Sequence, residues 1–151
     1  MNEKYLKIKK LFDLAIQHHK KNNFLSAEKL YKEILEMNVN DLPTLNNLGN
    51  VLKELKKYKE AIFYYEKALK INPKDIVTNY NFGLLFNKLE EFQKSASFYE
   101  KIIKIDPKHI QSYNALMDIY EKTGNHEKLK KIIVHAKTFL KNNSIIKLYE
   151  G

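Results

Sequence analysis

Histidines and paired carboxylates are the side chains in this sequence that could perform metal or catalytic chemistry. The histidines are His18, His19, His109, His126 and His135, and cysteine is absent. Adjacent residues on a helix point about 100° apart, so His18 and His19 do not form the i, i+4 pair that holds a metal ion. The missing cysteine excludes a disulfide framework, a thiolate zinc site and a cysteine nucleophile. We expect no metal site and no cofactor.

Glu90 and Glu91 are the remaining candidates for acid–base chemistry, and they fall in a predicted turn. General acid–base catalysis needs a cleft that holds both groups against a substrate, and no spacing here implies such a cleft. The sequence also lacks the serine-centred turn that carries the nucleophile in many hydrolases. We therefore expect that the protein is not an enzyme.

The charge of the chain favours a lysine-covered surface over a nucleic-acid interface. The 151 residues carry a formal net charge of +9, and all 27 basic residues are lysine. Arginine is the side chain suited to bidentate contacts with phosphate and guanine, so its absence weakens a nucleic-acid interpretation. The N-terminus is too charged for a secretory signal, and no apolar run approaches the length of a membrane span. We expect a cytoplasmic location, and whether the chain is a fragment of a longer protein stays open.

A repeat of 34 residues organises the chain. Gly49 and Gly83 lie at the same point of two similar stretches, NNLGNVLKELKKYKEAIFYYEKALKINP and YNFGLLFNKLEEFQKSASFYEKIIKIDP. Alignment on these glycines gives the units 8–41, 42–75, 76–109 and 110–143. Successive positions read Ala15, Gly49, Gly83, Met117; then Ala27, Ala61, Ser95, Leu129; then Tyr31, Tyr65, Tyr99, Ile133; then Ile34, Ala68, Ile102, Ala136; and then Val39, Pro73, Pro107, Lys141.

Each unit contains two runs with apolar residues at i, i+3, i+4 and i+7, which predict two amphipathic helices. In the second unit these helices cover residues 41–55 and 58–71. The turns inside the units fall at 20–23, 56–57, 90–91 and 123–125. Asp41 and Asp75 are the expected N-caps of the helices that follow them. Pro73 and Pro107 follow the ends of second helices, where a residue without an N–H prevents further helix.

The recurring glycine weakens a helix by about 1 kcal/mol relative to alanine, so its position needs a reason. We expect Gly49 to face Ala61 across the hairpin and Gly83 to face Ser95, with the two backbones in close approach. Large neighbours such as Tyr65 would interlock around this contact. No Gly-rich strand-to-helix turn surrounds either glycine, so a phosphate-binding role is not expected.

This pattern resembles the tetratricopeptide repeat. The signature residues are Gly49, Ala61, Tyr65, Ala68 and Pro73 in the second unit and Gly83, Ser95, Tyr99 and Pro107 in the third. The resemblance implies an all-α fold, namely a right-handed α-solenoid of antiparallel helix hairpins that forms a single domain over residues 1–151. First helices would line its concave face and second helices its convex face.

Recognition in this family typically uses the inner face of the first helices. The corresponding groove residues here are Asn46, Asn47, Asn50, Lys53, Tyr80, Asn81, Leu84, Asn87, Gln111, Asn114 and Asp118. Side-chain amides offer donors and an acceptor that match the backbone of an extended peptide. Asn47 and Asn81 resemble the asparagine ladder in the repeat superhelix of O-GlcNAc transferase. The alternative is that these amides only reflect a chain rich in asparagine.

Repeat domains that hold the C-terminal carboxylate of heat-shock chaperones have basic residues at set positions. This chain has Asn46, Gln111 and Ala115 there, so a carboxylate would lack its charge-assisted hydrogen bonds. We do not expect such a clamp.

The main functional prediction is a non-enzymatic scaffold or adaptor that binds an extended peptide or a partner helix, of unknown identity, in the concave groove. The alternative is an oligomeric architectural protein that self-associates through its terminal faces. This alternative is based on the apolar tail 144–151, which is interpreted either as a capping helix or as the start of a further element. Binding of nucleic acid or an anionic surface rests only on the lysines.

Overall fold

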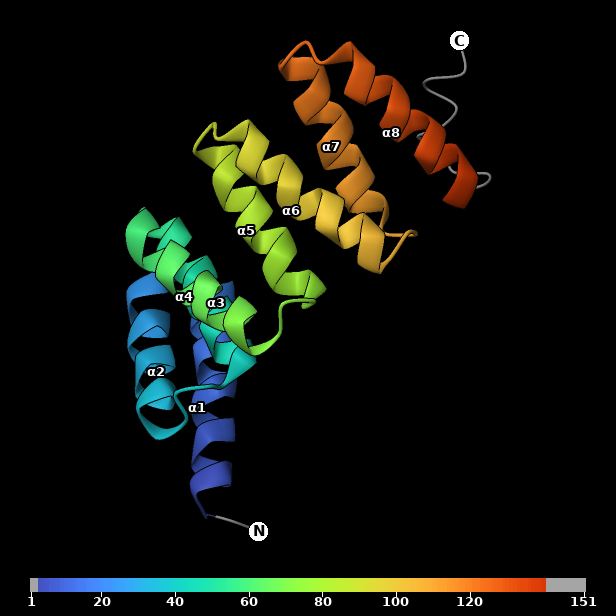
Figure 1. The fold of residues 1–151 in the computed structure, drawn as a ribbon. Coiled ribbons are helices and arrows are strands. Elements are labelled where there is room, and N and C mark those ends of the chain that lie inside the picture. Colours follow the sequence, from blue (N-terminus) through green and yellow to red (C-terminus); the bar gives the residue numbers. More distant parts are fainter. Residues whose placement is uncertain (1–2, 141–151) are drawn as a thin grey trace. The chain divides into compact units, whose positions relative to one another are not determined.

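The computed structural model describes residues 3–140 and consists there of helices joined by short turns (Figure 1). Eight helices follow one another in this part of the chain: α1 (Glu3–Lys20), α2 (Phe24–Met37), α3 (Leu42–Glu54), α4 (Tyr58–Ile71), α5 (Ile76–Lys88), α6 (Phe92–Ile105), α7 (Ile110–Lys122) and α8 (His126–Phe139). The all-α prediction is confirmed. The predicted helix 58–71 has the observed bounds, and the observed α3 is one residue shorter at each end than the predicted helix 41–55. The predicted element at 144–151 lies outside the described residues.

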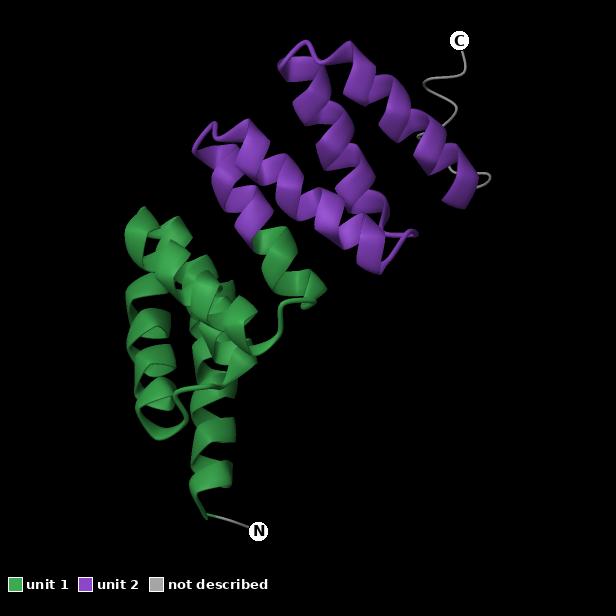
Figure 2. Cartoon of the chain, viewed as in Figure 1, with its two compact units in different colours: residues 1–81 green, residues 82–151 purple. Residues whose placement is uncertain are grey.

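The chain divides into two compact units, residues 1–81 and residues 82–151 (Figure 2). The first unit contains the helices α1 to α4 and the beginning of α5. The second unit contains the rest of α5 and the helices α6 to α8. In the first unit α1 packs on α2, α2 on α3 and α3 on α4, and in the second unit α7 packs on both α6 and α8.

The turn inside every hairpin uses one residue in the left-handed backbone conformation. These residues are Asn22, Lys56, Glu90 and Gly124, with φ between 59° and 65°. In the second hairpin Lys57 N–H donates to the Leu52 carbonyl over 2.8 Å, and Lys56 N–H donates to Lys53 over 3.1 Å. This is the hydrogen-bond pattern of a Schellman motif, which satisfies the last carbonyls of a helix. The helix end is therefore built identically at a spacing of 34 residues, although only one of the four residues is glycine.

Aspartates begin two of the first helices, as the sequence predicts. Asp41 Oδ2 accepts a hydrogen bond from Thr44 N–H at 3.1 Å, and Asp75 Oδ2 accepts from Thr78 N–H at 2.7 Å. His109 takes the same role for α7, because its Nδ1 accepts from the Ser112 N–H. Each cap satisfies an amide that has no partner within the helix.

Tyrosine rings fill the space that the recurring glycines leave. A Cβ placed on Gly49 would lie 2.6 Å from Tyr65 Cε1, and one on Gly83 would lie 2.9 Å from Tyr99 Cε1. The Tyr65 ring thus packs against Gly49, as expected of a large neighbour, and the contact between Gly49 and Ala61 stays a prediction. Gly83 and Ser95 do meet, since Ser95 Oγ donates to the Gly83 carbonyl over 2.8 Å. Both glycines are required by packing.

The other signature residues of the repeat belong to the two hydrophobic cores. In the first unit Ala61, Tyr65 and Ala68 are fully buried, and in the second unit Ser95 and Tyr99 are fully buried. Pro73 and Pro107 lie in the connections between hairpins. No helix within residues 3–140 is long and apolar enough to cross a membrane.

Candidate functional site

Asn50 on α3 is the best-oriented polar side chain among the predicted groove residues. The Tyr65 hydroxyl on α4 donates to Asn50 Oδ1 over 2.7 Å. In this arrangement the oxygen end of the Asn50 amide faces Tyr65, and no described residue accepts a hydrogen bond from Asn50 Nδ2. The side chain is half-buried. Asn50 therefore presents a hydrogen-bond donor with a defined direction.

Asn81 on α5 is held by a second amide contact, also within the first unit. Its Nδ2 donates to Asn46 Oδ1 on α3 over 3.1 Å. Asn46 is placed differently from the expectation, because only 7 % of its surface is exposed. It supports Asn81 from beneath. Asn81 itself is half-buried and keeps its Oδ1 as an acceptor, since no described residue donates to that atom.

Asn47, Lys53 and Tyr80 complete the predicted residues of the first unit, and all three are half-buried. Asn47 Nδ2 donates to the Pro43 carbonyl one turn earlier on α3, at 2.9 Å, so its donor is used inside its own helix. The Lys53 ammonium lies 3.4 Å from the Glu54 carboxylate. We name Asn50, Lys53, Tyr80 and Asn81 the α3–α5 amide surface.

His19 on α1 lies near the end of α3. Burial lowers the pKa of His19 below its ordinary value of 6.5; the charge of Glu54 opposes this shift and the charge of Lys53 adds to it. The ring packs edge-to-face on Phe24, with centroids 5.9 Å apart. The imidazole is therefore neutral at pH 7 and adds no positive charge beside Lys53.

The predicted residues of the second unit are placed on α5 and α7. Leu84 and Asn87 are half-buried, whereas Gln111, Asn114 and Asp118 are exposed. The Asp118 carboxylate pairs with Lys122 on the same helix at 2.8 Å, which is a surface pair of small energetic value. Apart from this pair, these side chains are not linked by hydrogen bonds like those of the α3–α5 amide surface.

The remaining chemistry-bearing groups serve the fold. Among the described residues no three His, Asp or Glu side chains gather as a metal-binding group. His135 is exposed, and its Nδ1 lies within hydrogen-bond distance of the Tyr113 hydroxyl, at 2.8 Å. Glu90 holds the left-handed turn position, and Glu91 precedes α6.

Glu28 on α2 is a buried charge that the sequence reasoning did not single out. Only 8 % of its side chain is exposed, and it accepts from Lys32 Nζ at 2.7 Å and from Lys57 Nζ at 2.8 Å. Burial alone raises the pKa of Glu28, but the two lysine hydrogen bonds outweigh it and hold the pKa below the ordinary 4.5. The contact ties α2 to the turn before α4. Its sequence signal is weak, because a glutamate and two lysines are unremarkable in this composition.

Taken together, antiparallel hairpins with identical turns define a helical-repeat protein. The tetratricopeptide repeat pattern matches residues 43–75 and again residues 77–109. Two tetratricopeptide repeats therefore lie at residues 43–75 and 77–109, and the eight described helices are consistent with four such units. No curated protein matches the chain in sequence. Tetratricopeptide repeat domains generally serve as protein–protein interaction modules.

Solved structures with the same fold share little sequence with this chain. A fragment of MamA from Desulfovibrio magneticus RS-1 is 19 % identical, with a TM-score of 0.78 over 91 % of this chain and 77 % of that one. A tetratricopeptide repeat protein from Parabacteroides merdae is 20 % identical, with a TM-score of 0.82 over 95 % and 57 %. The first such domain of Spaghetti, bound to an HSP90 peptide, is 17 % identical, with a TM-score of 0.73 over 79 % and 94 %. These likenesses concern the fold alone.

Proposed function

We propose that the protein is a cytoplasmic scaffold or adaptor whose α3–α5 amide surface binds an extended segment of a partner protein. The observation that carries this proposal is the pair of oriented amides. Asn50 offers a donor because Tyr65 occupies its oxygen, and Asn81 offers an acceptor because Asn46 occupies its nitrogen. A donor beside an acceptor is the complement of a peptide backbone.

The spacing of these amides also fits an extended chain. Asn46 and Asn50 are one turn apart on α3, a rise of about 6 Å, and Asn81 is bound to Asn46. Backbone groups on one edge of an extended strand recur about every 6.6 Å. A partner helix fits less well, because its N–H and C=O groups are already bonded to each other. Tyr80 and Lys53 would contact the side chains of the bound segment.

A carboxylate clamp is a poor alternative for this surface. The Spaghetti domain is bound to the HSP90 peptide SRMEEVD. The amide surface has Lys53 as its only cation, and this lysine already lies beside Glu54. We expect the SRMEEVD peptide not to bind, because its carboxylates would lack charged partners. It serves as a negative probe.

The test uses the full chain to select peptides from a displayed random library. Peptides so obtained are then measured against two variants, Asn50→Asp and Asn40→Asp. Aspartate at position 50 keeps the oxygen that Tyr65 needs but removes the donor, so the hairpin stays intact. Asn40 is an exposed turn residue that does not belong to the α3–α5 amide surface. Its variant therefore makes the same charge change outside the proposed binding site.

Asn50→Asp should weaken binding of the selected peptides by about tenfold or more, because a buried carbonyl left unpaired costs about 1–3 kcal/mol. Asn40→Asp should stay within about twofold of the parent chain. The proposal fails if both variants bind the selected peptides as tightly as the parent does.

Self-association through the chain ends stays a prediction. One observation favours it: Leu14 on α1 is 43 % exposed, whereas Leu48, at the same repeat position on α3, is fully buried. Light scattering over a range of protein concentrations tests it. A monomer at the highest concentration would exclude this alternative.

A further inference from the structure

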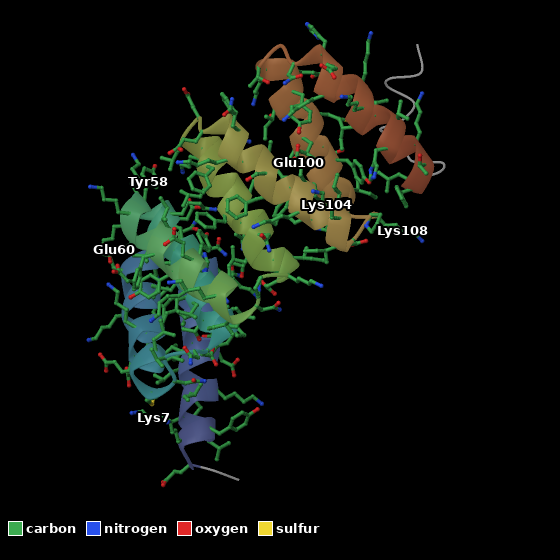
Figure 3. All side chains as sticks on the ribbon, in the orientation of Figure 1. Lys7, Tyr58, Glu60, Glu100, Lys104 and Lys108 are labelled. Carbon is green, nitrogen blue, oxygen red and sulfur yellow. The ribbon has the colours of Figure 1, made fainter. Side chains whose placement is uncertain are left out.

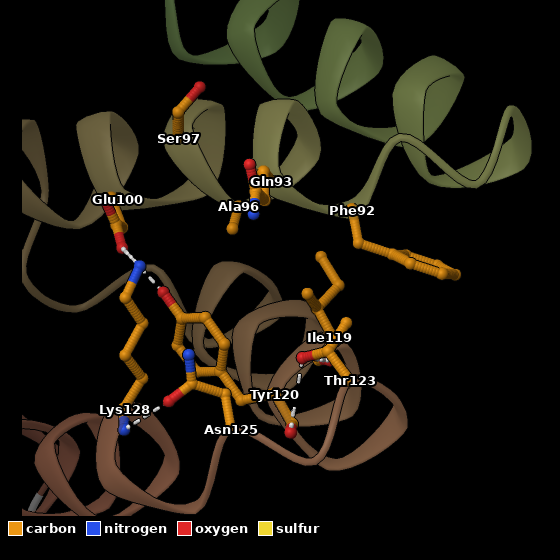
Figure 4. Close-up of a pocket in the computed structure, with 10 residues that line it drawn as sticks. All are labelled: Phe92, Gln93, Ala96, Ser97, Glu100, Ile119, Tyr120, Thr123, Asn125 and Lys128. Carbon is orange, nitrogen blue, oxygen red and sulfur yellow. Dashed lines mark hydrogen bonds and ion pairs between the residues drawn. The ribbon is translucent and has the colours of Figure 1, made fainter.

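A groove runs between α6 and α8 in the second unit, and none of the residues that line it belongs to the α3–α5 amide surface. Two hollows of about 560 and 570 Å³ share Glu100, Tyr120 and Lys128 in their lining and therefore form one continuous groove. Figure 4 shows the first hollow, with side chains of α6 on one wall, Lys128 on the other and Tyr120 of α7 between them. We call this the α6–α8 groove.

The groove exists because of the side chains that the two second helices turn toward each other. On α6 the small residues Ala96 and Ser97 leave space. On α8 the facing residues are Lys128, Lys131 and His135, which lie on one face at helical spacing. Long polar side chains here do not close the gap as interlocking aliphatic ones would.

The single carboxylate in the groove already has partners. The Tyr120 hydroxyl donates to Glu100 Oε1 over 2.6 Å. The Lys128 ammonium lies 4.0 Å from the same carboxylate and 5.5 Å from the centre of the Tyr120 ring. Burial and the Glu100 carboxylate both raise the pKa of Tyr120, which stays protonated. This cluster holds Lys128 across the groove (Figure 4).

The other two lysines of the groove make no strong ion pair within the part of the chain that the structure describes. Lys104, labelled with Glu100 on α6 in Figure 3, is exposed and has no ion pair among residues 3–140. Lys131 pairs only with Glu127 on its own helix, and both side chains are more than 70 % exposed. Such a pair is worth little and is readily exchanged. The groove thus contains three lysines and one glutamate, and this glutamate is already hydrogen-bonded to Tyr120.

The floor beneath these lysines is apolar. Ile103, Pro107 and Ile132 line the second hollow together with the Tyr120 ring. Lys128 already lies over the Tyr120 ring, the aliphatic side chains offer no stacking platform for a base, and the lysines cannot make the bidentate contacts of arginine. The chemistry favours a protein ligand over a nucleic acid.

We propose that the α6–α8 groove binds an acidic segment of a partner protein. One bulky apolar side chain of that segment sits on the floor of Ile103, Pro107 and Ile132. Its flanking carboxylates face Lys104, Lys128 and Lys131. The charge complementarity steers the segment, and burial of the apolar anchor supplies the affinity. This surface is independent of the α3–α5 amide surface and has its own ligand.

The experiment uses the full chain and a fluorescein-labelled peptide that carries several Asp and Glu residues around one Phe. A second peptide replaces the Phe with Ser. The test variant is Lys104→Glu/Lys131→Glu. The control variant, Lys101→Glu/Lys130→Glu, makes the same charge change on exposed residues of the same two helices outside the groove lining. Fluorescence anisotropy gives the dissociation constants, and circular dichroism shows that both variants fold.

The Phe peptide should bind, and the Lys104→Glu/Lys131→Glu variant should weaken it by about tenfold or more, because like charges then oppose each other. The control variant should weaken it by less than about threefold. The Ser peptide should bind about tenfold more weakly than the Phe peptide. Equal losses in both variants, or equal binding of both peptides, would overturn the proposal in favour of unspecific charge attraction.

A single-stranded DNA of equal charge completes the series. Binding of the DNA that only the groove variant abolishes, without binding of the Phe peptide, would also overturn the proposal and assign the groove to nucleic acid. Asn50→Asp should leave binding of the Phe peptide unchanged, so failure of the amide surface and failure of the groove give different results.

Discussion

The Tyr65 hydroxyl donates a hydrogen bond to Asn50 Oδ1 across the second hairpin, at 2.7 Å. One repeat earlier the corresponding residues are Tyr31 and Ile16, and no acceptor stands at this position. Among the described residues the fully buried Tyr31 hydroxyl has no hydrogen-bond partner, and burial raises its pKa to about 12. The same ring position is therefore satisfied in one hairpin and unsatisfied in the other.

This difference predicts opposite effects for the same substitution. Tyr65→Phe should lower the free energy of unfolding by about 1 kcal/mol, because it removes a made hydrogen bond. Tyr31→Phe should leave the free energy unchanged or raise it slightly, because it removes a buried group without a partner. Urea unfolding of the two variants measures both free energies. Equal destabilisation would contradict the finding that of these two hydroxyls only that of Tyr65 has a hydrogen-bond partner among the described residues.

Gly49→Ala should destabilise the protein by about 1 kcal/mol. The added Cβ would stand 2.6 Å from Tyr65 Cε1, and overpacking costs about 1–3 kcal/mol against the gain of about 1 kcal/mol in helix propensity. Thermal unfolding gives the loss. In a Tyr65→Leu background the same change should cost less, and an additive double variant would show that the ring is not the obstacle.

Lys56→Gly should stabilise the protein by about 1 kcal/mol. Lys56 has a φ of 59°, a conformation that costs a residue with a Cβ about 1–2 kcal/mol. Lys56→Ala is the matched control, because alanine bears the same steric cost, and it should change little. Chemical denaturation compares the three chains, and equal stability of the glycine and alanine variants would refute the strain.

Glu28→Gln should destabilise the protein in a pH-dependent way. Because the folded-state pKa of Glu28 is below its ordinary 4.5, the ionised carboxylate stabilises the fold at any pH above that value. This contribution is lost as the pH falls through the lower folded-state pKa.

At pH 7 the expected loss is about 1–3 kcal/mol, since Lys32 and Lys57 each lose a charged acceptor. Unfolding measured from pH 7 down to pH 3 should show the parent chain and the variant converging at the acid end. Glu36→Gln, an exposed glutamate on the same helix, should show no such convergence. A constant difference at every pH would contradict the role of the Glu28 charge.

The helices of this protein were predictable because their signals are local. The apolar spacing of residues 58–71 gave the observed bounds of α4, and Asp41 and Asp75 cap the next helices as expected. The two-repeat glycine pattern also predicted a close approach within each hairpin. The pattern placed Tyr65 near this contact, but it did not show that the ring itself fills the space beside Gly49, because that depends on the conformation of the Tyr65 side chain.

The fine structure of the candidate site was not predictable from one sequence. The bond between Asn46 and Asn81 joins residues on two different repeats, and it buries Asn46, which the spacing alone placed beside a ligand. The direction of the Asn50 amide depends on a tyrosine of another helix. Lys and Glu do not favour the left-handed conformation, so the sequence does not predict it at Lys56 and Glu90. The identical helix ends are seen only in the backbone φ angles.

The unmatched Tyr31 hydroxyl has a consequence for the order in which the first unit opens. The α1–α2 hairpin also buries the His18 Nδ1 without a hydrogen-bond partner among the described residues, and it leaves Tyr5, Leu6 and Leu14 exposed along α1. We expect its stability to be lower than that of the α3–α4 hairpin, where the Tyr65 hydroxyl is hydrogen-bonded and Leu48 is fully buried, although Thr44 Oγ1 on α3 is also buried without a partner among the described residues. Amide hydrogens of α1 and α2 should accordingly exchange with solvent before those of α3 and α4. Unfolding of this unit would then begin at the α1–α2 hairpin.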